Sequence, residues 1–322
     1  MAISIPKPIE FVPRGTRIPF VSYFKFCFTL SIVLNIATII LLATVGLNFG
    51  IDFRGGTLIE IRTTQGPADL ASLRSTLGGL GLGDVQIQEF GAPDTVLIRV
   101  AEQPGGEKAQ QDAVAKVQHA LGSNVEMRRT EVVGGTVSAE LIHNAIIAII
   151  LTCLGIFIYV WFRFEWQFAL GAVVALVHDV FLTVGLYTAL QMEFDLTIVA
   201  ALLTILGYSI NDTVVIYDRI RENLRKYKKT PLAELIDLSV NETLTRTVMT
   251  VGTVILALLS LYFFGGEVIR GFTFAMLFGV IVGTYSSVFI AAPFLMLLGV
   301  KRDWSGIKAA ASSSAGRRTA DV

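Results

Sequence analysis

The sequence has little charge and almost no cysteine. Only 16% of its 322 residues are charged, whereas soluble proteins carry roughly 25%. Its 26 basic residues balance its 26 acidic residues, so no strong net field points to nucleic acid as a partner. Cys27 and Cys153 both lie in apolar runs, which argues against a disulfide framework and against a cysteine metal site.

Signatures of common catalytic sites are also missing. The chain has no Walker A sequence, no H-E-x-x-H motif and no nucleophile elbow. The glycine-rich stretch 78–83 lacks the strand–turn–helix context of a nucleotide site and indicates the end of a helix. His119 and His143 stand alone, which favours structural roles. We therefore expect a protein that is not an enzyme, binds no metal or cofactor, and draws its energy from a gradient or a partner.

Apolar residues, by contrast, are abundant. They make up 53% of the chain, and the mean hydropathy is +0.65. Stretches of about 20 apolar residues can cross a bilayer as helices. Six are long enough, at 24–47, 139–161, 167–190, 196–218, 246–264 and 271–298. The first is longer than the apolar core of a signal peptide, so we expect it to be a retained anchor.

Basic residues indicate the orientation of these spans. Lys and Arg cluster in the segment before the first span, in the loop after the fourth and in the C-terminal tail, whereas the loop 191–195 has none. The positive-inside rule then places both termini in the cytoplasm. The expected domains are a cytoplasmic segment 1–23, helix 24–47, an external domain 48–138, helices two to six in 139–298 with a cytoplasmic loop 219–245, and a disordered cytoplasmic tail 299–322.

The segment between the first two spans has the pattern of a small α+β domain. Residues 57–63, 85–90, 95–100 and 125–133 alternate as strands do, and 68–80 and 107–121 have helical spacing. A Gly-Ala-Pro-Asp turn is expected between the second and third strands. The order β-α-β-β-α-β predicts a ferredoxin-like unit. The predicted fold is thus a polytopic α-helical membrane protein with six transmembrane helices and one external ferredoxin-like domain.

The fourth span carries polar residues where lipid would favour apolar ones. Thr204, Tyr208, Asn211 and Asp212 follow i, i+4, i+7, i+8 spacing and so share one helical face. A carboxylate inside a membrane costs roughly 2.5–3.5 kcal/mol on insertion scales, and such residues usually face protein or water. The alternative is that Asp212 reaches the interface, but it lies about 10 Å from Arg219 along the helix at 1.5 Å per residue.

A cation could offset this cost. Arg246 opens the fifth span, which runs antiparallel to the fourth, and its long side chain could reach Asp212. The alternative is an ordinary basic flank of a membrane helix.

A second ionisable pair lies in the third span, where His178 and Asp179 stand near the expected bilayer centre. A coupled, buried carboxylate there could bind and release protons. The alternative is a polar knot that only joins helices.

Four stretches match a known family. The sequences GIDFRGGT (50–57), VHDV (177–180), GYSINDTVVIYDRIREN (207–223) and NETLTRT (241–247) resemble the SecD/SecF family of bacterial protein-export membrane subunits. Together with six spans and one external domain, the resemblance covers essentially the whole chain. The family is similar in plan to the resistance-nodulation-division exporters.

The resemblance implies a multi-pass subunit of the bacterial inner membrane that works with SecD. The pair would use the proton-motive force to promote preprotein translocation after the action of SecA and the SecYEG channel, with YajC and YidC as further partners. It also implies proton-relay roles for Asp212, Arg246 and, less directly, Asp179. Tyr208, Asn211, Thr204 and His178 would form the supporting polar face. Two other interpretations remain open: a small-molecule or lipid exporter of related architecture, and a passive scaffold.

Overall fold

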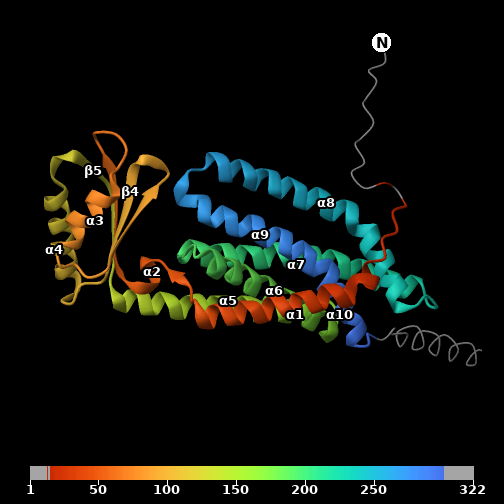
Figure 1. Cartoon of the computed structure of the whole chain (residues 1–322). Helices are drawn as coiled ribbons and strands as arrows, with labels where there is room; N and C mark the ends of the chain where they lie inside the picture. The colour runs from red at the N-terminus through yellow and green to blue at the C-terminus, as the bar shows by residue number, and fades with distance from the viewer. Residues whose placement is uncertain (1–12, 14, 301–322) are drawn as a thin grey trace, which may run out of the picture.

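The computed structural model describes Pro13 and residues 15–300. It consists of a bundle of long helices with a small α+β domain at one end (Figure 1). Within the described residues, six helical segments are long and apolar enough to cross a membrane, which confirms the predicted spans. They are Phe20–Thr44, Gly135–Arg163, Trp166–Leu190, Leu196–Lys226, Leu232–Phe264 and Glu267–Leu297. The tail from residue 301 onward, which was expected to be disordered, lies outside the described residues.

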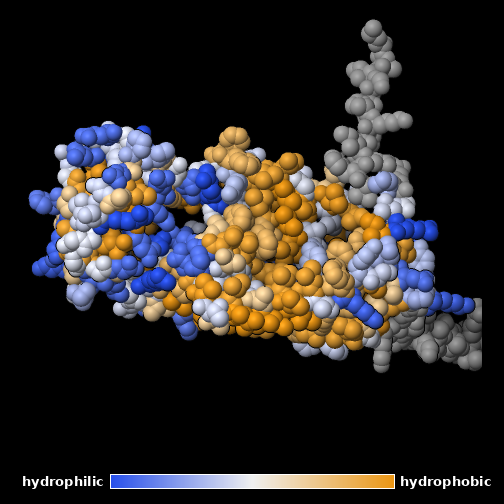
Figure 2. Space-filling view, viewed as in Figure 1, coloured by the Kyte–Doolittle hydropathy of each residue, from blue (hydrophilic) through white to orange (hydrophobic). Residues whose placement is uncertain are grey.

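These spans contain α1 (Phe24–Thr44), α5 (Gly135–Arg163), α6 (Trp166–Leu190), α7 (Leu196–Lys226) and α8 (Leu232–Phe264). The last span is α9 (Arg270–Ser286), a π-helical turn (Ser287–Ala291) and α10 (Ala292–Leu297). Large apolar side chains on the outer surface of the bundle form a hydrophobic band (Figure 2). In water such a surface would be costly, but lipid tails solvate it.

The external domain is a four-stranded sheet with two helices. In chain order it contains β2 (Gly56–Thr63), α3 (Leu70–Gly78), β3 (Val85–Phe90), β4 (Ala92–Val100), α4 (Gly106–Leu121) and β5 (Val125–Val133). The sheet order is β3-β4-β2-β5 and every neighbouring pair is antiparallel. This is the split βαβ arrangement that the sequence predicts.

One face of this sheet packs on both helices. Ile59, Ile61, Val96 and Ile98 point to that face and form a core with residues of α3 and α4 such as Val117. The predicted four-residue turn before β4 is wrong. The strand already begins at Ala92, so Gly91, with φ of 77°, makes the turn almost alone.

The GIDFRGGT stretch connects the external domain to the bundle. Its short helix α2 (Ile51–Arg54) places Asp52, whose Oδ2 accepts a hydrogen bond from the backbone N–H of Leu196 at 2.9 Å. Asp52 thus adds an acceptor at the start of α7, beside the N-cap Asp195. Gly56 has φ of 124°, and a β-carbon there would lie 2.4 Å from the Val100 carbonyl oxygen, so only glycine fits.

At the opposite end of the bundle, two of the long helices continue beyond the predicted spans. The residues of the predicted loop 219–245 belong mostly to α7 and α8, with the break at 227–231. Glu242 of α8 accepts hydrogen bonds from Arg219 and Asn223 of α7, each at 2.7 Å. These contacts set the antiparallel register of the two helices, so that Asp212 is level with Thr250.

Glycines in the spans divide into two groups. A β-carbon at Gly279 of α9 would lie 2.2 Å from Ile205 Cδ1 of α7, so these helices meet closely there. By contrast, a β-carbon at Gly207 or at Gly252 would have no neighbouring atom within 4 Å. The open surfaces at these two positions leave room for another helix.

Candidate functional site

Asp179 lies at the centre of the bundle and is fully buried. Its Oδ2 accepts hydrogen bonds from Ser209 of α7 at 2.6 Å and from Ser286 of α9 at 2.9 Å. Its Oδ1 lies 3.0 Å from Nδ1 of His178. A carboxylate with three polar neighbours is far less costly to bury than an isolated one. Asp179 therefore joins α6, α7 and α9 through one hydrogen-bonded cluster.

The π-helical turn of the last span begins next to this cluster. Directly after Ser286, the Ser287 hydroxyl lies 2.8 Å from that of Thr213 and donates to the Ser209 carbonyl at 3.3 Å. π-Turns interrupt α-helices mostly where a site requires it. The sequence pattern did not single out these serines, because an isolated hydroxyl in an apolar run has no periodic signal.

His178 continues the polar path away from Asp179. Its ring centroid lies 6.1 Å from that of Tyr285, whose hydroxyl lies 3.1 Å from Ser31 and donates to the Cys27 carbonyl at 2.9 Å. The Nε2 atom of His178 is buried and has no hydrogen-bond partner among the described residues. His178 therefore belongs to the Asp179 cluster and not to the face of Asp212.

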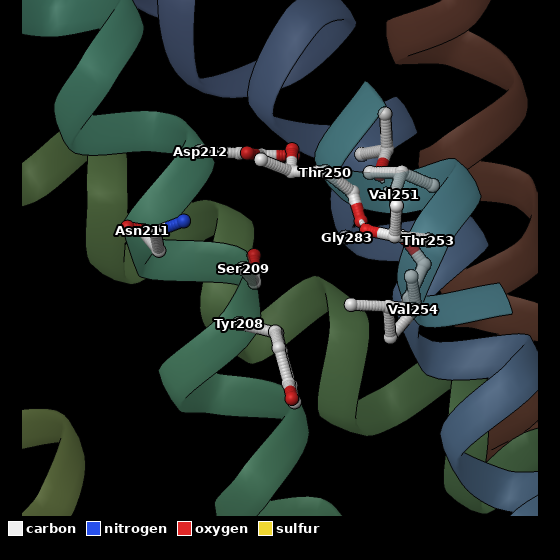
Figure 3. Close-up of a pocket in the computed structure, with 11 residues that line it drawn as sticks. Tyr208, Ser209, Asn211, Asp212, Thr250, Val251, Thr253, Val254 and Gly283 are labelled. Atoms are coloured by element: carbon white, nitrogen blue, oxygen red, sulfur yellow. Dashed lines mark hydrogen bonds between the residues drawn. The ribbon is translucent and has the colours of Figure 1, made fainter. Parts of the chain in front are cut away.

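Asp212 borders a cavity of about 240 Å³ between α7, α8 and α9. Its side chain extends from α7 toward Thr250 of α8 (Figure 3). Although only 7% of its surface is exposed, its carboxylate accepts no hydrogen bond within the described part of the chain. Ser209 lines the same cavity, so one residue touches both the Asp179 cluster and the space beside Asp212.

The polar stripe predicted on the fourth span is only partly brought together. Tyr208 and Asn211 line the cavity with Asp212, but both are also exposed on the outside of the bundle. Thr204 does not line the cavity, and its hydroxyl donates to the Ala200 carbonyl of its own helix at 2.8 Å.

Arg246 does not pair with Asp212 in this structure. No nitrogen–oxygen contact within 4 Å joins the two side chains, and Arg246 is exposed beside Asp218 and Glu242. The register of α7 and α8 explains this, because it places Arg246 about one helical turn, roughly 5.4 Å, beyond the level of Asp212. A direct ion pair, which the sequence left open, would require α8 or the arginine side chain to move.

Charged residues also join the external domain to the bundle. Arg99 of β4 forms an ion pair with Glu193, which lies in β6 (Glu193–Phe194) between α6 and α7. Burial raises the pKa of Glu193, the carboxylates of Asp195 and Asp52 raise it further, and Arg99 opposes the rise. No group of three or more potential metal ligands occurs among residues 13 and 15–300.

Comparisons with known proteins agree with this architecture. Residues 113–301 match the family described as protein export membrane protein SecD/SecF, C-terminal, and residues 40–67 match the SecD/SecF GG motif. The protein translocase subunit SecF of Cereibacter sphaeroides is 48% identical over 303 residues, which are 91% of this chain and 93% of that protein.

Longer relatives contain a similar segment. The protein translocase subunit SecDF of Brucella abortus is 43% identical over 92% of this chain, but only 39% of the relative is covered. The crystal structure of SecDF, a translocon-associated membrane protein from Thermus thermophilus, matches with a TM-score of 0.80 at 32% identity, over 90% of this chain and 40% of that one. These matches confirm the resemblance seen in the sequence, and the chain belongs to the SecD/SecF family of protein-export membrane proteins.

Proposed function

We propose that this chain, a Sec translocase subunit of the inner membrane, forms a complex with SecD and uses the proton-motive force to promote preprotein export. Fusion relatives support the partnership, since a segment like this chain occupies about 40% of the SecDF proteins of Brucella abortus and Thermus thermophilus. The open surface at Gly207, beside exposed Tyr208 and Asn211, is where we expect SecD helices to pack. Polar side chains inside a membrane usually face another protein segment.

The observation that carries the proton proposal is the position of Ser209. It donates a hydrogen bond to Asp179 and lines the cavity beside Asp212. Two intramembrane carboxylates are thus connected through one hydroxyl and a space large enough for water. In this proposal Asp212 takes up and releases the coupling proton, and Asp179 is a second proton-binding group.

Arg246 is the counter-charge in this proposal. When Asp212 is ionised, it attracts the guanidinium about one turn away; when Asp212 is protonated, Arg246 stays in its exposed position on α8. Tyr208 and Asn211 solvate the cavity, while His178 supports Asp179 on the other side of Ser209. A charge moved across the membrane supplies about 2.3 kcal/mol per 100 mV, which is enough to bias a conformational equilibrium.

The topology and the partners complete the proposal. Both termini lie in the cytoplasm and the external domain lies in the periplasm, as the basic residues favour. The chain acts after SecA has driven the preprotein into SecYEG, with YajC and YidC as further partners. It needs no cofactor besides protons and carries out no catalysis of its own.

The test is preprotein export into inner-membrane vesicles, with and without an uncoupler. Asp212→Asn keeps the shape of the side chain but cannot ionise, so export should fall to the rate of the uncoupled wild type. Asp218→Asn is the matched control, because Asp218 is exposed and pairs with Arg163 at 2.9 Å. Normal gradient-stimulated export by Asp212→Asn would contradict the relay and favour a passive scaffold. If Asp212→Asn preserved preprotein export and the chain also transported small molecules, the result would favour a small-molecule exporter.

A further inference from the structure

A large basic groove lies at the end of the bundle away from the external domain. It has a volume of about 790 Å³, and it is lined by six basic and three acidic side chains from α7, α8 and the end of α5. Figure 2 shows hydrophilic residues at this end of the molecule, next to the hydrophobic band of the spans. The groove therefore lies where lipid headgroups meet the protein.

The acidic residues in the groove already have partners. Asp218 pairs with Arg163 at 2.9 Å, and both Glu222 and Glu242 pair with Arg219 at 2.7 Å. All three acids are thus engaged by Arg163 and Arg219, and six basic against three acidic side chains leave a formal charge of +3 in the groove. The groove therefore keeps an excess of positive charge.

The remaining cations are Arg221, Arg225, Lys226 and Arg246. None of them has a carboxylate partner within 4 Å among the residues that the structure describes. Arg221 is held in place, since its Nη1 donates to the carbonyl of Arg163 at 3.0 Å and its guanidinium lies 5.9 Å from the centre of the Phe164 ring. Arg225 follows one turn later on α7, so both arginines line the same side of the groove.

Exposed aromatic side chains precede Arg163, the residue of α5 that lines the groove. At the end of α5, Phe162 is 88% exposed, and Tyr159 and Trp161 are more than half exposed. Aromatic side chains in such positions lie at the level of lipid headgroups. An occupant of this groove would thus meet several unpaired cations beside a surface suited to acyl chains.

We propose that this groove binds the phosphate headgroup of an anionic phospholipid, with Arg221, Arg225 and Arg246 as its ligands. Arginine forks match phosphate oxygens in two-point hydrogen bonds. Basic pockets between membrane helices are suited to anionic headgroups. An acidic protein segment could match the charge, but the exposed aromatic side chains at the end of α5 are suited to the membrane interface, so the lipid fits both features. The site does not depend on the proposed proton function.

The test uses the purified complex of this chain with SecD in mild detergent. Phosphatidylglycerol and phosphatidylcholine with identical acyl chains are titrated in, and native mass spectrometry counts the lipids bound per complex. The wild type should retain phosphatidylglycerol in preference to phosphatidylcholine. R221Q/R225Q should lower this preference by at least about tenfold, because each basic residue near an anionic surface contributes substantially.

K25Q/K229Q is the matched control. It removes the same charge from the same end of the bundle, but Lys25 and Lys229 are exposed and do not line the groove. This variant should keep the wild-type preference. An equal loss in both variants, or no preference in the wild-type complex because a protein partner covers the groove, would overturn the proposal. The proposal would also be overturned if inorganic phosphate displaced bound phosphatidylglycerol as effectively as added phosphatidylglycerol does. That result would indicate a site for free anions. Since export is not measured, failure of the relay would leave these results unchanged.

Discussion

Ser209 Oγ donates a 2.6 Å hydrogen bond to Asp179 Oδ2, across the contact between α7 and α6. Ser209 also lines the cavity that Asp212 borders three residues further along α7. The two acidic residues of the spans therefore have different environments. Asp179 is enclosed by hydrogen-bond donors, whereas Asp212 faces a space. This difference allows their roles to be tested separately.

Asp179→Asn should separate proton binding from helix packing. The amide keeps an oxygen acceptor for Ser209 or Ser286, so the variant should accumulate in the membrane at the wild-type level. It cannot ionise, and export should lose its stimulation by the gradient. Asp179→Ala instead leaves the Ser209 hydroxyl without its acceptor and should cost about 1–3 kcal/mol of stability. Export by Asp179→Asn at the wild-type rate, measured with and without an uncoupler, would show that the cluster only joins helices.

Arg246→Lys should strongly impair gradient-stimulated export without lowering the amount of protein. Lysine keeps the charge, but its ammonium is more strongly hydrated and lacks the planar fork of arginine. It is therefore a poor partner for a carboxylate about one helical turn, roughly 5.4 Å, away along the bundle. Export rates in vesicles at matched protein levels check this prediction. Full activity of the lysine variant would mean that Arg246 only marks the membrane boundary.

Gly279→Ala should destabilise the bundle, whereas Gly207→Ala should not. The new methyl group at Gly279 would overlap Ile205, and overpacking of this kind costs about 1–3 kcal/mol. At Gly207 no atom lies within 4 Å, and alanine favours the helix by up to about 1 kcal/mol. Thermal unfolding of the chain in detergent compares the two variants. Equal stability of both would contradict the close contact between α7 and α9. A loss of SecD binding by a bulkier Gly207→Leu variant would support the packing of SecD at this position.

Glu193 should make stability depend on pH. Its folded-state pKa lies above the ordinary value of 4.5, chiefly because of burial, so the native state holds the proton more tightly than the unfolded state. The contribution of Glu193 to stability is thus greatest below pH 4.5 and falls as pH rises through the raised pKa. Unfolding temperatures measured from about pH 4 to about pH 7 should fall less steeply in Glu193→Gln. Arg99→Gln should make the fall steeper, since Arg99 opposes the rise in pKa. Identical curves for all three proteins would contradict this assignment.

Local patterns in the sequence determined the spans and most of the external domain. The strands β3 and β5 begin and end at the predicted residues, 85–90 and 125–133. Hydrophobicity and residue alternation are local properties, so they can be read without knowing which elements are neighbours. Composition placed the start of the fifth span at residue 246, whereas α8 already begins at Leu232, because a polar segment marks the membrane boundary and not the end of a helix.

Only the tertiary structure decided which polar residues meet. Asp179 finds Ser209 and Ser286, which are 30 and 107 residues away along the chain. Helical periodicity shows which residues share a face, but it does not show which helix covers that face or at what height. The height is set by contacts such as that between Arg219 and Glu242, which shift Arg246 one turn away from Asp212. The sequence by itself therefore identified the ionisable residues, while the register of packed helices determined their partners.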